Sequence, residues 1–538
     1  MPKLQTNGAK QKRTTYMILL LWAAVCFALL VVDWCCWAPN RLDADMASEQ
    51  LLANLLAQEG GAMSASWYYS TELRVLNTQL VMAPLFRLFT SWHTVRVVGS
   101  VVLILLYLAA WFWFGRSAKL KYSGLLGAGL LVLPYGALYR QYVLEGLYYI
   151  PHIAISFVVL GCAVRILRGG RRLAPAAGMV LFSFAAALGG PRQLFILNIP
   201  LTVAAALLCW LDAPPADTLR QKLANAWRTP GGALLVPTLA ANAAALAGYL
   251  VNTKVLAEKY HFQDQGYVAF TGLNLDRLQW FVNALLASFG WQEGKVFSLT
   301  TLFNLAAAAL IVFCFVFSVW LVRGKARYPL GHRLVGAFFL AGAVCFALLY
   351  GLTNSGHSDR YLLPLAILFV PLLEIMLVDC APRHRPDARG MMALLAVILL
   401  LRAGTDYRAA AVATNPNQGA AQFLVQNGYR DGYASFWDGN VMTELTDGTL
   451  NVWTLTPNSV PELRPWLQVT SHLQTPPQGK IFFVISKWEA YGERQPTTQA
   501  LADAMPEDAL IYEDGTVKIY GFASDEAMRQ TCGFAAFP

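Results

Sequence analysis

Apolar stretches long enough to cross a lipid bilayer recur through roughly the first four hundred residues of this chain. Hydrophobic residues make up 56% of the sequence and charged residues only 14%, a composition typical of membrane proteins. The pattern predicts a membrane all-α fold with about eleven transmembrane helices. They are expected over residues 16–37, 95–114, 122–139, 148–167, 173–190, 193–211, 233–251, 299–322, 334–352, 361–379 and 388–407.

Basic residues gather in alternate connecting loops, at 10–13, 116–121, 165–172, 220–228, 323–333 and 383–389. Cytoplasmic loops of membrane proteins are enriched in Lys and Arg. The alternation therefore predicts a cytoplasmic N-terminus in a cell membrane, an odd number of spans and an extracytoplasmic C-terminus. The net charge of +9 is mainly a topology signal, so we expect the lipid bilayer, and no nucleic acid, as a partner.

The first apolar stretch ends in the bulky, proline-broken run 35–39 rather than in a small-residue cleavage site, so we expect it to be retained as a span. Most of the nine cysteines lie inside predicted spans, and the C-terminal tail holds only Cys532. This distribution predicts neither a disulfide framework nor a zinc site.

The first outward loop carries carboxylates directly after the first span, at Asp43, Asp45 and Glu49. Carboxylates at this spacing suit a general base, a metal site or both. An amphipathic helix is expected after Asp45, lying flat in the membrane interface with Asp45 and Glu49 on its polar face. A second amphipathic stretch is expected over 66–89.

Other outward segments also carry groups suited to chemistry. The loop 254–295 is predicted to form a partly ordered lid, and 354–364 is dense in polar side chains. Arginines fall in two tight outward turns and near the outer end of the last span, where a charge must face a polar cavity or partner. The candidates in these segments are Arg140, Arg192, His357, Asp359, Arg360, Tyr361 and Arg402.

The composition changes after the last span, which predicts a transmembrane domain over 1–407 and a small extracytoplasmic α/β domain over 415–538. In the tail we expect a helix over 418–427, strands over 433–437, 451–455 and 481–485, and a hairpin turn at 513–516. No internal repeat, Walker A loop, dinucleotide fingerprint, HExxH or nucleophile elbow occurs in the sequence, which argues against an ATP-driven transporter and a serine hydrolase.

On these residues the chain resembles the GT-C superfamily of integral-membrane glycosyltransferases, close in pattern to polyprenyl-phosphate-sugar-dependent mannosyl and aminoarabinose transferases. The acidic run 43–45 matches by position the loop that holds that family's catalytic base. The run Arg360-Tyr361-Leu362-Leu363-Pro364 is similar to the family's late outward Arg-Tyr-x-x-Pro segment. The run 67–74, with Tyr69, Glu72 and Arg74, resembles the loop helix of bacterial members, and we predict that these three residues bind substrate.

The resemblance implies membrane-parallel helices in the first outer loop and an inverting transfer of a sugar from a polyprenyl-phosphate carrier to an envelope glycan, lipid or protein. Asp45 or Asp43 would act as the base, and arginines would stabilise the departing phosphate, with Arg360 and Arg402 preferred over Arg192 and Arg140. No nucleotide cofactor is expected. Whether Asp43, Asp45 or Glu49 holds a divalent cation stays open.

Several candidates also have a structural alternative. Asp43 can be a solvated loop acid, and Asp45 can cap the following helix. Glu72 and Arg74 can form surface ion pairs, while Arg402 can extend to the outer interface from a lipid-facing position. The rival functions are a transporter or flippase of a lipid-linked or anionic sugar, and a non-catalytic envelope-assembly protein.

Overall fold

The computed structural model of the protein describes residues 2–169, 172–263, 268–294, 296–325, 327–356, 358–380, 386–456, 462–488 and 496–532. The chain divides into two units. The first, here called the helical unit, comprises Met1–Asp33, Val102–Thr253 and Gly266–Arg408. The second, here called the mixed unit, comprises Trp34–Val101, Lys254–Gln265 and Ala409–Pro538.

Eight helices among the described residues are long and apolar enough to cross a membrane, which confirms a multi-pass membrane protein without confirming the count of eleven. They are Lys12–Cys36, Trp92–Ala118, Ile150–Leu167, Leu194–Asp212, Pro230–Leu256, Leu299–Arg323, Leu330–Leu352 and Asp359–Asp379. A shorter apolar helix, α8 (Leu173–Ala187), lies in the predicted span 173–190, and α17 (Pro386–Val412) contains the predicted span 388–407.

The predicted span 122–139 is not one helix. It is divided into η2 (Lys121–Gly124), α5 (Leu125–Leu131) and α6 (Ala137–Tyr139). Gly124 adopts a left-handed φ of +80°, and a Cβ there would come within 3.0 Å of the Trp111 indole. Only glycine meets both demands without strain. The break is therefore set by a close tertiary approach that hydropathy cannot reveal.

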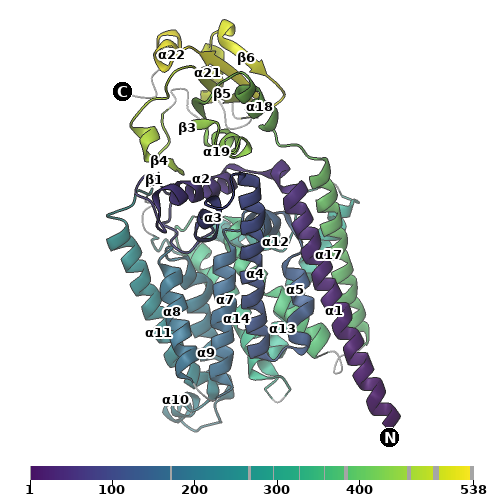
Figure 1. Cartoon of the computed structure of the whole chain (residues 1–538). Helices are drawn as coiled ribbons and strands as arrows, with labels where there is room; N and C mark the ends of the chain where they lie inside the picture. The colour runs from purple at the N-terminus through teal and green to yellow at the C-terminus, as the bar shows by residue number, and fades with distance from the viewer. Residues whose placement is uncertain are drawn as a thin grey trace. The chain divides into compact units, whose positions relative to one another are not determined.

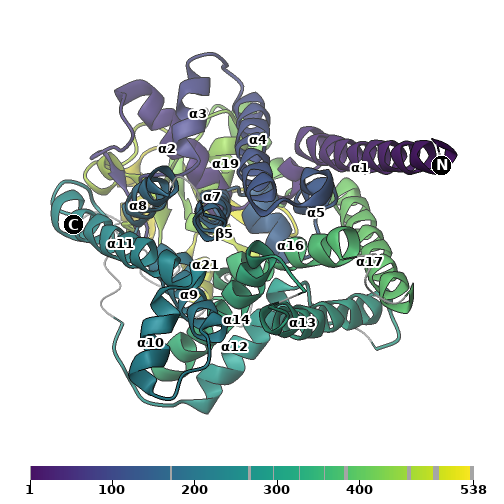
Figure 2. The same ribbon diagram turned by 90° about the horizontal axis from the view of Figure 1, so that it is seen from below.

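The core of the helical unit is a bundle in which α7 (Ile150–Leu167), α8, α9 (Ile199–Asp212), α11 (Pro230–Val251) and α14 (Leu330–Leu352) pack against one another (Figure 2). Helix α13 (Leu299–Arg323) packs on α14. At Gly248 of α11, a Cβ would lie 2.4 Å from the Phe184 carbonyl oxygen of α8. Small residues at such crossings let helix backbones approach closely, as is typical of membrane helices.

The mixed unit begins with the segment after the first predicted span, which forms α2 (Ala44–Glu59), β1 (Trp67–Tyr68) and α3 (Gln79–Phe86) (Figure 1). A helix is thus present after Asp45, and α3 covers only 79–86 of the second expected stretch, 66–89; the run 67–74 is not a helix. Trp67 pairs with Val469 and Tyr68 with Gln468 of β4 (Gln468–Val469). Backbone pairing with a distant segment overrides the local amphipathic pattern there.

The tail of the chain contributes a five-stranded sheet to the mixed unit, in the order β3 (Asn451–Leu455), β2 (Asp431–Ser435), β5 (Ile481–Ser486), β7 (Val517–Phe522) and β6 (Leu510–Glu513). The first three strands are parallel, and β7 and β6 are antiparallel to their neighbours. These strands, together with α18 (Gln418–Gln426), confirm the predicted small α/β region and its hairpin. The predicted strand 433–437 instead ends at Ser435, because α19 (Phe436–Leu445) begins there.

Helix α2 packs against α3 on one side and α19 on another. Asn440 of α19 donates a 2.8 Å hydrogen bond to Ser48, whose own hydroxyl donates to the Ala44 carbonyl oxygen. Leu51 and Leu55 of α2 line a cavity together with residues of the tail such as His472. The apolar face of α2 is therefore at least partly occupied by protein.

The predicted lid, 254–295, is divided between the two units. Its start belongs to the mixed unit, where the Tyr69 amide donates to the His261 carbonyl oxygen at 2.8 Å. Its later part contains α12 (Leu275–Ser288), which packs on α14 in the helical unit. Residues 264–267 and 295 lie outside the described part of the chain.

Candidate active site

The acidic start of α2 separates the two candidate bases by role. Asp43 is the N-cap residue, and its Oδ1 accepts a 2.8 Å hydrogen bond from the Met46 amide. Asp45 lies in the first helical turn. The sequence suggested that Asp45 caps the helix, but Asp43 is the residue with this function. Helix capping therefore does not explain Asp45.

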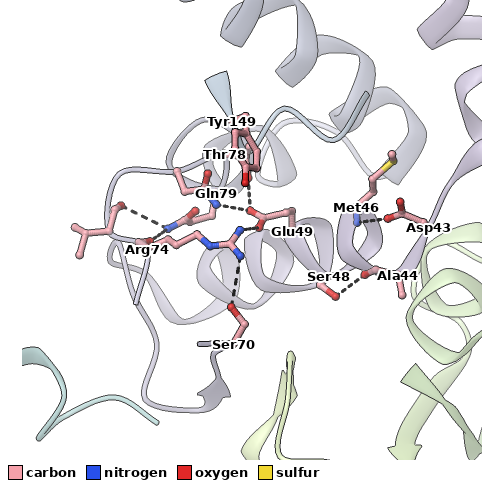
Figure 3. A network of polar contacts seen from close by, with 12 residues as sticks. Asp43, Ala44, Met46, Ser48, Glu49, Ser70, Arg74, Thr78, Gln79 and Tyr149 are labelled. Atoms are coloured by element: carbon pink, nitrogen blue, oxygen red, sulfur yellow. Dashed lines mark hydrogen bonds and ion pairs between the residues drawn. The ribbon is translucent and has the colours of Figure 1, made fainter. Parts of the chain in front are cut away.

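Glu49 lies one helical turn after Asp45 and is buried, with 8% of its surface exposed. Figure 3 shows its carboxylate at the centre of a polar network. It accepts hydrogen bonds from Asn77 Nδ2 at 2.9 Å, from Arg74 Nη1 at 3.3 Å and from the Thr78 hydroxyl. The network fixes the 74–78 turn against α2, which is a structural role. The predicted contact of Glu49 with substrate stays a prediction.

Burial raises the pKa of the Glu49 carboxyl, and the Arg74 charge and the Thr78 hydrogen bond act in the opposite direction. The Asp45 charge also raises this pKa. The electrostatic interaction between the two carboxylates agrees with the prediction that Asp45 and Glu49 share one face of α2.

Tyr69, Glu72 and Arg74 follow β1 but lie in different surroundings. Tyr69 is buried, with its hydroxyl accepting a 2.9 Å hydrogen bond from the Ser64 amide and its ring packed edge-on against Tyr260. Glu72 is half-buried. Arg74 also bonds Ser70 Oγ at 3.5 Å. Tyr69 therefore belongs to the core of the mixed unit in this structure, since its Oη and ring contact protein groups.

The remaining candidates lie in the helical unit. Arg192 stacks over the rings of Tyr361, at 5.0 Å from the centroid, and Tyr149, at 5.5 Å. Arg360 stacks over Tyr142 at 5.1 Å. Tyr142 and Tyr149 are 6.0 Å apart by ring centroid. The structure thus brings together two predicted arginines and Tyr361 in one aromatic cluster, here called the Arg–Tyr cluster and defined by these five residues.

Asp359 opens the short helix η6 (Asp359–Leu362) that carries Arg360 and Tyr361. Two hydrogen bonds hold the start of this helix. The Ser288 hydroxyl of α12 donates to the Asp359 carbonyl oxygen at 2.8 Å, and the Tyr350 hydroxyl donates to the Ser358 carbonyl oxygen at 3.2 Å. Asp359 is exposed. His357 lies outside the described residues.

Arg140 and Arg402 are found with acids. Arg140 forms ion pairs with Asp406 and, at 3.6 Å, with Glu145. Arg402, which is 6% exposed, lies over the Phe303 ring at 5.2 Å and interacts electrostatically with Asp406, one helical turn further along α17. This burial argues against the alternative in which Arg402 faces lipid and extends to the membrane interface. Both arginines are compensated within the bundle, as intramembrane charges generally are.

Sequence reasoning missed the partners that define both clusters. Asn77 and Thr78, which hold Glu49, and Tyr142 and Tyr149, which stack on the arginines, carry no motif. The dense tyrosines at 139–149 were one available signal, since aromatic rings next to arginines favour cation–π interactions. Among the described residues, no group of three or more His, Cys, Asp or Glu side chains is arranged to hold a metal ion.

No protein-family model matches the sequence, and no curated protein matches it. Solved structures do resemble it. ArnT from Cupriavidus metallidurans in the apo state aligns with a TM-score of 0.53 at 12% identity, over 95% of this chain and 98% of that one. The Archaeoglobus fulgidus oligosaccharyltransferase, tethered to an acceptor peptide with the NVT sequon, aligns with a TM-score of 0.44 at 12% identity, over 81% of this chain.

This chain spans 63% of the length of that oligosaccharyltransferase structure. A second structure of the same enzyme, with zinc and sulfate, gives a TM-score of 0.44 at 11% identity, over 88% of this chain and 68% of that one. The alignment with ArnT runs through nearly the whole of both chains. The chain therefore shares the fold of ArnT, in agreement with the predicted resemblance.

Proposed function

We propose that this protein is a membrane glycosyltransferase that moves a sugar from a polyprenyl-phosphate carrier to an envelope glycan, lipid or protein at the outer face of the cytoplasmic membrane. The observation that carries the proposal is the fold match to ArnT over 95% of this chain and 98% of that one. Two features of the chain support it: the acidic start of α2 and the Arg–Tyr cluster. Fold alone does not determine chemistry, so the proposal depends on these side chains.

Asp45 is the proposed base. It would take the proton from the acceptor hydroxyl or amine as that group attacks the anomeric carbon, with inversion there and departure of the carrier phosphate. Its position supports this choice, because Asp45 lies in the first turn of α2, in the acidic run that matches by position the loop of the family's base. Asp43 is the alternative base.

Arg360 and Arg192 are the proposed phosphate ligands. Stacking on tyrosine rings orients the planar guanidinium group, and an oriented guanidinium suits two parallel hydrogen bonds to a phosphate. Negative charge develops on the leaving phosphate in the transition state, so these bonds would lower the barrier. Arg402 and Arg140 are further candidates, and each interacts with Asp406 in the bundle.

The test is release of free polyprenyl phosphate by purified protein supplied with carrier-linked sugars and an acceptor. Wild type is compared with Asp45→Asn and Asp43→Asn. Asparagine caps a helix about as well as aspartate, so Asp43→Asn should keep the cap, and Asp45→Asn changes a residue that is not the cap. We expect Asp45→Asn to lower turnover by about two to four orders of magnitude, the usual contribution of a general base. Donor binding should change little.

Asp508→Asn is the matched control, because Asp508 is an exposed acid of the tail in η10 (Glu507–Ala509). Full turnover in the Asp45 variant together with loss in the Asp43 variant would move the base to Asp43. Sugar uptake into vesicles without any release of polyprenyl phosphate would replace the proposal with a transporter. Specific lipid-phosphate binding with neither activity would indicate a non-catalytic envelope protein.

A further inference from the structure

A short helix of the helical unit, α10 (Leu219–Trp227), lies in the connection between α9 and α11 and packs against both. Figure 1 shows it at the end of the bundle where α9 ends and α11 begins. The helices before and after this connection are long and apolar enough to cross a membrane, so α10 lies at the level where two spans leave the bilayer. The basic residues of the connection predict that it faces the cytoplasm.

One side of α10 is apolar and exposed. Leu219, Leu223 and Trp227 recur at every fourth position, so they form a stripe along one side of the helix, here called the α10 stripe. Their exposed fractions are 66%, 47% and 53%. Among the nine residues of α10, only Ala226 is buried. Isolated helices shorter than about 12 residues are marginal in water, so a further apolar contact along the α10 stripe would stabilise this helix.

Basic residues flank the α10 stripe. With about 100° of rotation per residue, Arg220 and Lys222 lie on opposite sides of it, and Arg228 follows the end of the helix. Arg220 and Arg228 are exposed. Asp217 is the only acid in the connection 213–229. An apolar face of leucine and tryptophan with basic residues around it is typical of a helix that lies in the plane of a membrane interface.

Lys222 locates α10 relative to the bilayer. Its Nζ lies 3.8 Å from the centroid of the Trp210 ring, in the last turn of α9, and Trp210 is 39% exposed. Tryptophan is enriched at the two membrane–water interfaces, so this contact places Lys222 near the lipid headgroups. At the same end of α9, Lys325 and the buried Arg333 both pair with Asp212, which leaves an excess of positive charge there.

We propose that α10 docks on anionic phospholipids of the leaflet at this end of the helical unit. The α10 stripe inserts at the boundary between headgroups and acyl chains, and the three basic residues around it bind headgroup phosphates. A zwitterionic lipid would satisfy the stripe, but only a net negative surface also satisfies the charges. Each basic residue near such a surface adds about fivefold in affinity. This inference does not depend on the proposed transfer of a sugar.

The test is hydrogen–deuterium exchange of the full-length protein in nanodiscs of phosphatidylcholine, with and without phosphatidylglycerol. Amides 223–228 report the opening of α10, because exchange of a helical amide requires its hydrogen bond to break. We expect these amides to exchange at least about fivefold more slowly when phosphatidylglycerol is present, the contribution of one basic residue at an anionic surface. Raised salt should reduce the difference, because it screens the charges.

Two variants separate the charges from the apolar contact. Arg220→Gln combined with Arg228→Gln should remove most of the phosphatidylglycerol effect and leave exchange in pure phosphatidylcholine as in wild type, since glutamine is a good helix former. Leu223→Gln should speed exchange in both kinds of nanodisc, because the stripe loses apolar area. The matched control is Arg430→Gln combined with Lys480→Gln, which removes the same charge from exposed positions of the tail. This control should behave like wild type.

Equal exchange of amides 223–228 in the two kinds of nanodisc would overturn the proposal. The same conclusion follows if the double arginine variant keeps the full phosphatidylglycerol effect, because the added lipid would then act elsewhere on the protein. A second readout is the ratio of phosphatidylglycerol to phosphatidylcholine that the purified protein retains from mixed micelles, which should be higher in wild type than in the double arginine variant. Neither measurement needs a sugar donor or turnover, so a failure of the proposed transferase activity would not be mistaken for a failure here.

Discussion

Arg96, near the start of α4 (Trp92–Ala118), donates two hydrogen bonds of 2.6 Å to the two carboxylate oxygens of Glu444 in α19. Both side chains are buried, and the Arg96 Nη2 also donates 3.0 Å to the Met46 carbonyl oxygen of α2. One guanidinium group therefore connects α2 to α19, although Arg96 and Glu444 are 348 positions apart in the sequence.

Breaking this pair should destabilise the protein strongly. Glu444→Gln leaves a buried guanidinium without its counter-charge, so we expect a loss of about 3–5 kcal/mol in the free energy of unfolding. The double replacement Arg96→Met with Glu444→Leu should recover most of this loss, because neither charge remains. Chemical denaturation in detergent measures both, and Glu507→Gln, at an exposed acid, is the control. Equal loss in the single and double variants would contradict the ion-pair explanation.

The Asp43 cap predicts a difference between two substitutions at one position. Asp43→Ala removes the acceptor for the Met46 amide and should cost about 0.5–2 kcal/mol, whereas Asp43→Asn should cost only a few tenths. Thermal unfolding followed by circular dichroism resolves the difference. If both variants unfold at the wild-type temperature, the cap does not contribute to stability.

The Glu49 network predicts a structural defect. Glu49→Ala leaves the side chains of Arg74, Asn77 and Thr78 without their shared acceptor, so we expect a loss of about 2–4 kcal/mol. Limited proteolysis should then cut the 60–78 segment earlier than in wild type. Asp45→Asn, which changes an acid on the same helix face, should leave the proteolysis pattern unchanged.

The Arg–Tyr cluster predicts selective effects on the carrier lipid. Arg360→Ala and Arg192→Ala should each weaken binding of polyprenyl phosphate by about 10- to 100-fold, the range for a lost hydrogen bond to a charged group. Arg360→Lys should recover only part of the affinity, because an ammonium group cannot donate two parallel bonds. Arg408→Ala, at an exposed position, is the control. Lipid-phosphate affinity unchanged in both alanine variants would remove this cluster from the site.

The buried imidazole of His472 predicts a pH effect on stability. The unfolded residue takes up a proton near its ordinary pKa of about 6.5, whereas the folded residue, with its pKa lowered to about 3, does not. The contribution of the neutral His472 side chain to the free energy of unfolding is therefore complete above pH 6.5 and is lost as the pH falls toward 3. Wild type should lose about 1.4 kcal/mol per pH unit more than His472→Gln between pH 6 and 5. If the free energies of unfolding of the two proteins change equally with pH, His472 does not cause this pH dependence.

The sequence predicted the elements that depend on local patterns. Long apolar runs indicated the membrane helices, and the hairpin at 513–516 and strands β3 and β5 followed from turn residues and β-branched or aromatic runs. The acidic start of the first loop and the segment 360–364 were recognised because their motifs are contiguous. All these signals lie within windows of roughly twenty residues, where hydropathy and backbone propensity act directly.

Tertiary structure decided which side chains meet. The 67–74 segment became a strand and turn because Trp67 and Tyr68 pair with β4, and Tyr69 was buried as a result. Glu49 is held by partners about 25 to 29 positions later in the chain. Arg402 and Arg140 are compensated by Asp406. Asn54 of α2 lines a cavity together with residues of the tail. The free energy of a buried polar group depends on its hydrogen-bond and charge partners. Partners that are distant in the chain produce no periodic pattern in the sequence, so sequence analysis cannot identify them.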